Sequence, residues 1–252
     1  MSVGRVLSPE TSVSDTNPEF DDLSRGYEDL LKDPLRDRFA GDNTQYFHVR
    51  KRDLLRRFFR RRRIDTSKLS FLDLGCGKGE LLKLLCGDFR ECFGCDPSSG
   101  MLEASELNAI GVQTRVQHNP QSLPFENAQF DFISAVCVYH HVTPDLRASL
   151  TAEVRRVLRP GGWFVIIEHN PYNPATRIIV SRTPVDANAI LLRPAEGRRL
   201  MRDAGFQVDA QQYFLYFPER LYNYFGGFEP VLAGVPLGGQ YAVFGDATEG
   251  IS

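Results

Sequence analysis

The sequence predicts an α/β protein built on a doubly wound, mostly parallel seven-stranded sheet. Three observations favour this fold class. Apolar segments of strand length alternate with amphipathic segments of helix length, the links between them are short, and a glycine-rich turn joins the first strand to its helix. A hydrophobic fraction of 42% with 25% charged residues is enough to cover both faces of such a sheet.

The elements follow one another along the chain with sharp boundaries. Apolar or alternating runs predict strands at 70–75, 91–96, 112–117, 130–138, 163–169, 206–217 and 240–245. Spacings of three and four predict helices at 79–86, 99–111, 144–158 and 193–205. Only a helix-like insert, 218–236, separates the last two strands, so we expect the last strand to run antiparallel at or near the edge.

Composition divides the 252 residues into one sheet domain with appendages. We expect a disordered tail at 1–19, rich in Ser, Thr, Pro and Glu, an N-terminal helical lid at 20–66 and the sheet domain at 67–252. The N-terminus lacks the apolar core of a signal peptide, and apolar runs are shorter than the roughly 20 residues of a membrane helix. We therefore expect a cytoplasmic protein.

The five cysteines favour free thiols in a reducing compartment, because their number is odd and their surroundings are apolar or glycine-rich. Cys92 and Cys95 form a CxxC pair, but they lie in an expected strand, where residues three apart point to opposite faces. We expect both to be buried hydrophobic side chains and not zinc ligands.

The segment FLDLGCGKGE carries the first chemical signal. Gly75, Gly77 and Gly79 remove the Cβ atoms that would keep a ligand from the start of the following helix. Glu80 stands where dinucleotide enzymes place their last glycine, which counts against NAD. Asp73, at the end of the strand, suits a cationic amino group, and Asp96, at the end of the next strand, suits ribose hydroxyls.

These motifs resemble those of the class I S-adenosylmethionine-dependent methyltransferases, in particular the small-molecule branch with its ubiquinone-pathway enzymes. DLGCGKGE is similar to the first motif of that family, Asp96 to its ribose acid, HNPQSLPF to the segment around the adenine, and LRPGGWFVI to the turn and fifth strand. The resemblance covers roughly 69–208 and implies a Rossmann-like methyltransferase fold with S-adenosylmethionine as cofactor. Asn119 replaces the usual Asp facing the adenine amino group, and its amide oxygen can still accept that hydrogen bond. The expected cofactor contacts are Asp73, Gly75, Cys76, Gly77, Gly79, Asp96, Pro97, Met101, Asn119, Pro120, Val136 and Cys137.

The methyl acceptor is expected beyond the fourth and fifth strands, because open α/β sheets bind ligands outside the carboxyl ends of their strands. His140, His141 and His169 follow these strands, and a neutral imidazole can take the proton of an acceptor hydroxyl. A histidine at position 141 is widespread in the resembling family, so for His141 a loop-bracing role is preferred. Tyr139, Asn170 and Tyr172 are secondary candidates.

No metal ion is expected. Some related quinone O-methyltransferases carry carboxylates in the loop after the fourth strand that hold a divalent metal, whereas Cys137 and His140 stand at the matching positions here. Methyl transfer also needs no metal in principle, since the sulfonium group is already activated.

A basic segment precedes the sheet domain. Between Arg50 and Arg63 there are nine Lys or Arg and one Asp, a charge of +8, which leaves −10 for the rest of a chain of net charge −2. Because Leu54, Leu55, Phe58 and Phe59 share one helical face, we favour a docked lid helix with a solvated basic side. An anionic acceptor, an acidic membrane surface and RNA remain open for this segment.

The sequence thus predicts an S-adenosylmethionine-dependent methyltransferase acting on a small molecule, with O-methylation as the leading reaction. The alternatives are an RNA methyltransferase that uses the Arg50–Arg63 helix and a non-catalytic cofactor-binding protein. Nucleic acid is not expected as a partner, because the chain lacks an appended RNA-binding module. Peripheral membrane contact and the oligomeric state are left open. Most Tyr and Phe residues of 213–230 are expected to pack in the core or a lid, with an apolar acceptor pocket or a dimer contact as the alternatives.

Overall fold

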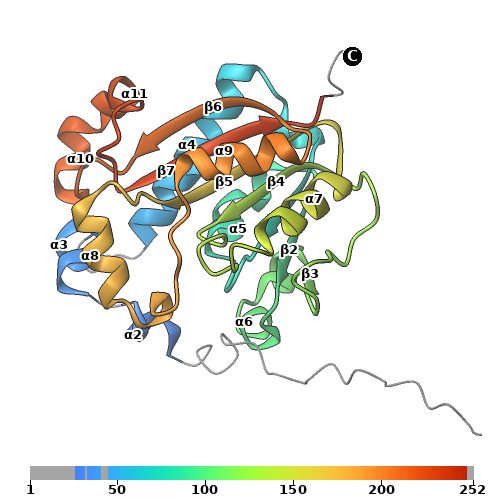
Figure 1. The fold of residues 1–252 in the computed structure, drawn as a ribbon, viewed down its shortest axis with the longest axis horizontal. Coiled ribbons are helices and arrows are strands. Elements are labelled where there is room, and N and C mark those ends of the chain that lie inside the picture. The colour runs from blue at the N-terminus through green and yellow to red at the C-terminus, as the bar shows by residue number, and fades with distance from the viewer. Residues whose placement is uncertain (1–25, 32, 41–44, 249–252) are drawn as a thin grey trace, which may run out of the picture.

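The protein is described here by a computed structural model, which places residues 26–31, 33–40 and 45–248. The expected tail, 1–19, and the first residues of the expected lid lie outside the described residues. A seven-stranded sheet of order β3-β2-β1-β4-β5-β7-β6 forms the centre (Figure 1). The strands are β1 Ser70–Leu74, β2 Glu91–Asp96, β3 Gln113–Val116, β4 Phe130–Val136, β5 Leu158–His169, β6 Gln207–Phe214 and β7 Gln240–Asp246.

The predicted sheet is confirmed. Strands β3, β2, β1, β4 and β5 pair in parallel, and β7 runs antiparallel to both β5 and β6. The last strand of the chain is therefore antiparallel and lies next to the edge, which β6 forms. The carboxyl ends of β1, β2, β4 and β5 consequently point in the same direction, where the site lies.

Helices cover both faces of the sheet. Residues of α7 and α9 pack in one apolar cluster and residues of α4 and α5 in another. The short helix α3 contacts both α8 and α10 beside the sheet (Figure 1). The helices are α2 Tyr27–Leu30, α3 Pro34–Ala40, α4 Gln45–Arg62, α5 Glu80–Leu85, α6 Ser99–Glu103, α7 Arg147–Val157, α8 Pro174–Arg182, α9 Pro194–Asp203, α10 Glu219–Phe225 and α11 Glu229–Leu232.

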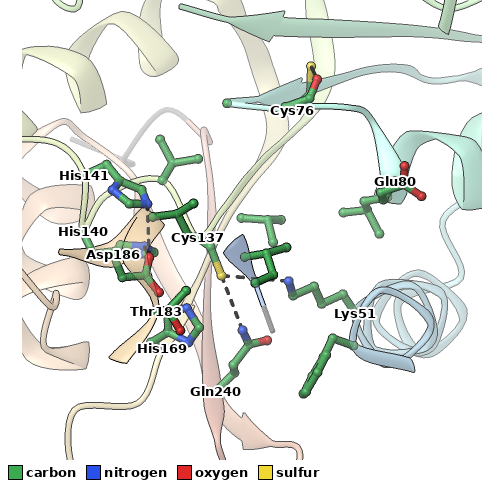
Figure 2. A pocket seen from close by; sticks show the side chains of 18 of the residues that line it. Lys51, Cys76, Glu80, Cys137, His140, His141, His169, Thr183, Asp186 and Gln240 are labelled. Atoms are coloured by element: carbon green, nitrogen blue, oxygen red, sulfur yellow. Dashed lines mark hydrogen bonds and ion pairs between the residues drawn. The ribbon is translucent and has the colours of Figure 1, made fainter. Parts of the chain in front are cut away.

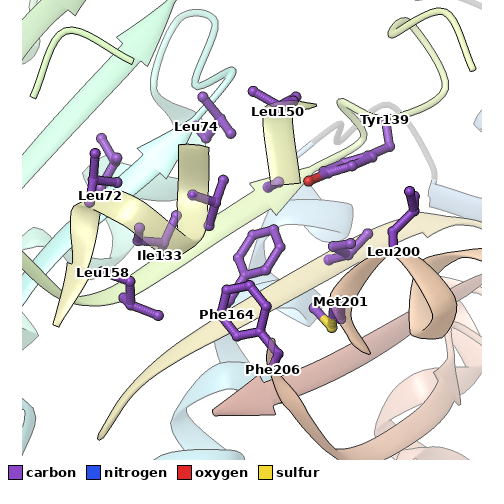
Figure 3. Close-up of a cluster of buried hydrophobic side chains, with 14 of the residues drawn as sticks. Leu72, Leu74, Ile133, Tyr139, Leu150, Leu158, Phe164, Leu200, Met201 and Phe206 are labelled. Atoms are coloured by element: carbon purple, nitrogen blue, oxygen red, sulfur yellow. The ribbon is translucent and has the colours of Figure 1, made fainter. Parts of the chain in front are cut away.

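Strand periodicity divides the core into two layers. Leu72, Ile133 and Phe164 belong to the apolar cluster on the side of α7 and α9, which also contains Leu200 and Met201 (Figure 3). Their chain neighbours point to the opposite face, because successive side chains of a strand alternate. Cys92 and Cys95 show the same alternation, since Cys92 belongs to one cluster and Cys95 to the other. The two thiols therefore cannot share a zinc ion, and both are free.

Helix α4, the basic helix expected to act as a lid, is a core helix for most of its length. Its apolar face is buried, and the ring of Phe58 stacks on Phe244 at 4.2 Å between centroids and meets Trp163 at 5.0 Å. Loss of such a ring costs about 3 to 5 kcal/mol of unfolding free energy. Only the first half of α4 reaches the cavity described below, through Gln45, Phe47, His48 and Lys51. No helix among the placed residues is long and apolar enough to cross a bilayer.

Candidate functional site

The glycine-rich turn after β1 has the backbone that its sequence predicts. Gly75, Gly77 and Gly79 have φ angles of +65°, +52° and +73°, which favour glycine over any residue with a Cβ. A Cβ on Gly77 would meet no atom within 4 Å, so the turn leaves open space beside its backbone. Helix α5 begins directly after Gly79. The turn therefore forms a cradle that a ligand can fill at the start of a helix.

Two buried carboxylates flank this cradle. Asp96 at the end of β2 accepts hydrogen bonds from the backbone N–H of Gly77 at 2.8 Å and of Ser98 at 2.9 Å. Asp73 in β1 accepts one from the hydroxyl of Ser134. Burial raises the pKa of Asp73 from 3.8 to about 7, while the Ser134 hydrogen bond and Lys51 act in the opposite direction. A cation placed against Asp73 would remove this penalty.

A single cavity of about 1210 Å³ extends from these carboxylates to the histidines after β4 and β5. Pockets for one small ligand measure roughly 300 to 1,000 Å³, so this cavity has room for a cofactor and an acceptor together. The expected site residues that line it are Asp73, Gly75, Cys76, Gly77, Asp96, Pro97, Met101, Pro120, Val136, Cys137, His140, His141 and His169.

Two expected cofactor residues lie off the cavity wall. A Cβ on Gly79 would meet Leu107 at 2.5 Å, so this glycine permits close packing beneath the turn. The side-chain oxygen of Asn119 accepts a hydrogen bond from the N–H of Gln121 at 2.8 Å. Gln117 and His118, which precede Asn119, line the cavity there instead.

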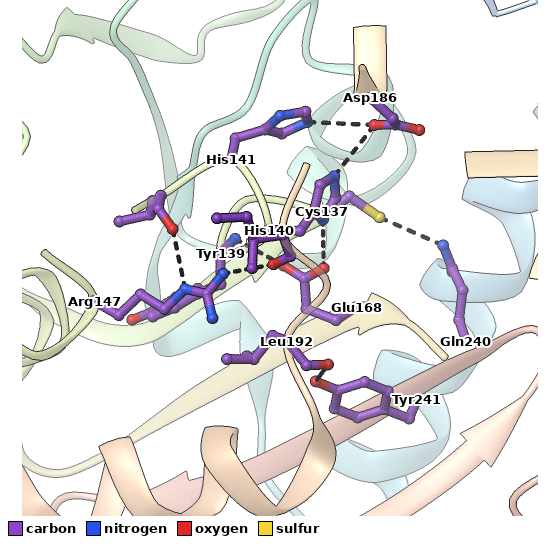
Figure 4. A network of polar contacts seen from close by, with 12 residues as sticks. Cys137, Tyr139, His140, His141, Arg147, Glu168, Asp186, Leu192, Gln240 and Tyr241 are labelled. Atoms are coloured by element: carbon purple, nitrogen blue, oxygen red, sulfur yellow. Dashed lines mark hydrogen bonds and ion pairs between the residues drawn. The ribbon is translucent and has the colours of Figure 1, made fainter. Parts of the chain in front are cut away.

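The histidines form a polar cluster at the far end of the cavity (Figure 4). His140 donates a hydrogen bond from Nδ1 to Glu168 Oε2 at 2.5 Å, and its Nε2 lies 3.4 Å from Asp186. Burial lowers the pKa of His140, but Glu168 and Asp186 outweigh burial and raise it above its usual range. Burial and the neighbouring His140 lower the pKa of His141 to about 4, so that ring is neutral.

A second group surrounds the thiol of Cys137 (Figure 2). The Sγ atom lies 3.9 Å from Lys51 Nζ and accepts a hydrogen bond from Gln240 Nε2 at 3.4 Å. Burial raises the pKa of Cys137, but Lys51 and His169 outweigh burial and lower it from 9.0 to about 7. Gln240 is buried, and its Oε1 atom has no hydrogen-bond partner among the placed residues. This oxygen is an acceptor that a ligand could satisfy.

Several polar residues of the cavity wall were not predicted from the sequence, among them Lys51, His48, Asp186 and Gln240. Lys51 and His48 lie in the basic helix α4, whose charges are expected from the sequence on its solvated side. Asp186 and Gln240 are each a single polar residue in a connection or at a strand start. No spacing rule marks them, because tertiary packing alone brings them to the histidines.

Comparison with known proteins gives the family of this site. A model described as a methyltransferase domain matches residues 72–166. The ubiquinone biosynthesis O-methyltransferase of Leptothrix cholodnii is 29% identical over 154 residues, 56% of this chain and 65% of its own. A ubiquinone/menaquinone biosynthesis C-methyltransferase of a Shewanella species is 30% identical over 162 residues, 60% of this chain and 62% of its own. An uncharacterized methyltransferase of Synechocystis is 34% identical over 103 residues, which make up 40% of this chain and 48% of its own. The chain thus spans about half to two thirds of the length of these relatives.

Solved structures agree on the fold. A protein of Thermotoga maritima, described as an S-adenosylmethionine-dependent methyltransferase and possible histamine N-methyltransferase, superposes with a TM-score of 0.67 at 21% identity, over 91% of this chain and 98% of its own. The matched model and this fold define a methyltransferase domain. It is a domain of the class I S-adenosylmethionine-dependent methyltransferases, and S-adenosylmethionine is its cofactor.

Proposed function

We propose that this protein transfers the methyl group of S-adenosylmethionine to a hydroxyl oxygen of a small, largely apolar molecule. The observation that carries the proposal is the continuity of one cavity from Asp73 and Asp96 to the histidine cluster. Asp73 would hold the cationic amino group of the cofactor, Asp96 the ribose hydroxyls and the glycine turn the adjoining chain.

The wall near the histidines supports an apolar acceptor. Val142 and Leu146 from the loop after β4, Ile179 from α8 and Val185 line this part of the cavity. Apolar walls with few polar groups are typical of sites that fix the orientation of a hydrophobic ligand. Relatives named for ubiquinone and menaquinone biosynthesis are consistent with an aromatic ring of this kind.

The polar groups favour a hydroxyl on that ring. Gln240 Oε1 is a buried acceptor with no partner among the placed residues, and an O–H group would satisfy it. When bound, the cofactor supplies an electrophilic methyl carbon, whose bond to sulfur breaks with the electron pair kept by sulfur. The acceptor oxygen forms the new bond to that carbon. His169, which lines the cavity at the end of β5, takes the hydroxyl proton.

The test is a methyl-transfer assay with labelled S-adenosylmethionine and a panel of hydroxylated benzoquinols and phenols, read by mass spectrometry. We expect a product heavier by one methylene unit with at least one phenolic acceptor. His169→Ala should lower the single-turnover rate roughly a hundredfold with little change in cofactor affinity. Methylation of carbon or nitrogen in place of oxygen, or a normal rate in His169→Ala, would contradict the proposal.

A further inference from the structure

We propose that His140, His141 and Asp186 bind a divalent transition-metal ion at the acceptor end of the cavity. The three residues can each offer one ligand atom, and these atoms lie within 4.8 Å of one another. Asp186 Oδ1 is 3.4 Å from His140 Nε2 and 3.5 Å from His141 Nε2. Two ligands bound to one zinc ion at a tetrahedral angle are about 3.4 Å apart. Both distances therefore match the separation of two ligands that share one ion.

Glu168 completes the arrangement that metal-binding histidines usually have. A ligating imidazole almost always donates its other ring N–H to a carboxylate or carbonyl, which fixes the tautomer and aims the free nitrogen at the ion. Here His140 Nδ1 donates to Glu168 Oε2, and Nε2 faces Asp186. Glu168 is itself held by the N–H of Tyr139 at 2.7 Å.

The ligand positions are held by the fold itself. The N–H of Ile190 donates to the carbonyl of His140 at 2.8 Å, which ties the segment after α8 to the loop after β4. The buried guanidinium of Arg147 donates to the carbonyls of Val142 and Ile190 on the two sides of this contact. Asp186 therefore approaches the histidines across a fixed junction (Figure 4). Sites supported by such contacts bind ions without rebuilding the chain.

Two imidazoles with one carboxylate favour zinc, iron, cobalt or manganese over magnesium and calcium, which prefer oxygen ligands alone. All three residues line the cavity, so the remaining coordination positions face the acceptor. The role of the ion rests on the function proposed above. A metal bound to the acceptor oxygen lowers the pKa of its hydroxyl, so that the proton leaves for solvent or His169 before the oxygen attacks the methyl carbon.

Titration of the full chain, dialysed against a chelator, with Zn²⁺ and with Co²⁺ tests the site without any turnover. We expect one equivalent to bind, with visible cobalt absorption typical of nitrogen and oxygen ligands. Asp186→Asn and His141→Gln should each weaken binding roughly tenfold to hundredfold, a range seen even for residues behind the ligands. His118→Gln, at an exposed histidine on another part of the cavity wall, is the matched control and should leave affinity unchanged. Circular dichroism of each variant confirms that it is folded.

Equal affinity in Asp186→Asn, His141→Gln and the control would overturn the proposal. So would a sulfur-to-cobalt charge-transfer band with unchanged affinity in Asp186→Asn, because it would place the ion on Cys137. The metal site and the proposed function fail separately. If the protein binds metal but methylates no phenol, only the proposed function is wrong. If the protein methylates a phenol at full rate and binds no metal, only the proposed metal site is wrong.

Discussion

His140 and Glu168 lie in direct contact, 2.5 Å from Nδ1 to Oε2, with side-chain exposures of 1% and 0%. Glu168→Ala leaves a buried imidazole without its carboxylate and frees the N–H of Tyr139. We expect the free energy of unfolding to fall by roughly 3 kcal/mol, the lower end of the cost of breaking a buried pair, because Asp186 still lies 3.4 Å from His140 Nε2. Urea denaturation measures this change in the free energy of unfolding. Glu168→Gln, which keeps an acceptor oxygen, should cost less, and Glu103→Gln, at an exposed helix position, should cost almost nothing. A loss below about 1 kcal/mol in Glu168→Ala would contradict the pairing.

Asp96 has two tasks, which a pair of substitutions can separate. Asp96→Ala should weaken S-adenosylmethionine binding by about 1 to 3 kcal/mol, because the ribose loses a charged acceptor and the N–H of Gly77 loses its partner. Asp96→Asn keeps an acceptor for one of these groups, so its affinity for S-adenosylmethionine should lie between those of Asp96→Ala and the native protein. Isothermal titration calorimetry gives both affinities. Unchanged affinity in a folded Asp96→Ala protein removes Asp96 from the cofactor site.

Cofactor affinity should depend on pH through Asp73. Burial raises its pKa from 3.8 to about 7 in the free protein, and only the ionised carboxylate pairs with a cationic amino group. Affinity is therefore expected to fall as pH drops below 7, by up to about tenfold per pH unit, and to level off above it. The contribution of Asp73 to the free energy of unfolding has the opposite pH dependence. Because the folded pKa exceeds the unfolded one, this group favours the folded state at low pH, and that contribution is lost as pH rises from about 4 to 7.

Calorimetric titrations between pH 6 and 8 measure the cofactor profile. Asp73→Asn cannot titrate and should bind weakly with no slope over the same range. Ser134→Ala removes a hydrogen bond that lowers the pKa of Asp73, so its profile should move to higher pH. A flat profile in the native protein would show that Asp73 does not bind the amino group.

Cys137 should be more reactive than Cys76, Cys92 and Cys95. Lys51 and His169 outweigh burial and lower its pKa to about 7, whereas burial raises the pKa of Cys92 and Cys95 to about 12. Thiolates are the nucleophilic form, so iodoacetamide at pH 7 should label Cys137 before these three, as followed by peptide mass spectrometry. Cys76 also lines the cavity but has a raised pKa, which makes it an internal control. Lys51→Met should slow the labelling of Cys137. Equal labelling rates for Cys137 and Cys76 would show that the pKa of Cys137 is not lowered.

The basic helix α4 should not bind RNA. Arg56 pairs with Asp88, Arg62 with Asp209, and Arg50 lies over the ring of Tyr222 at 3.6 Å, so part of the charge is used within the molecule. A mobility-shift assay at moderate salt is expected to show no complex with structured RNA. Tight binding that weakens steeply with salt, and that disappears in Arg60→Glu/Arg61→Glu, would favour the RNA methyltransferase alternative.

Sequence reasoning succeeded where structure and chemistry are local. The turn of Gly75 and Gly77 and the acid Asp96 follow strand ends directly, so their positions come from strand and helix periodicity alone. The opposite faces of Cys92 and Cys95 follow from the same rule. Helix α8, in contrast, was not predicted, because a short run after Pro174 carries little periodic signal.

The acceptor end of the cavity could not be predicted without the folded structure. Asp186 reaches His140 only through the junction of Ile190 with the β4 loop, a contact between segments about fifty residues apart. Lys51 was placed on a lid because its basic neighbours dominate the composition, yet it is buried against Cys137. Glu168 is one polar residue at the end of an apolar strand, and the sequence does not reveal its partner His140, which lies in the loop after β4.

Two of the chain segments that line the cavity differ in architecture. The end with Asp73 and Asp96 belongs to β1, β2 and the tight turns after them, where strand pairing and the bond from Gly77 N–H to Asp96 hold the backbone. The end with Ile179, Val185 and Asp186 belongs to a connection of helix and turn between β5 and α9. Insertions and substitutions in such a connection disturb no strand pairing. Changes in this connection can therefore reshape the acceptor end of the cavity while the strand pairing around Asp73 and Asp96 stays the same.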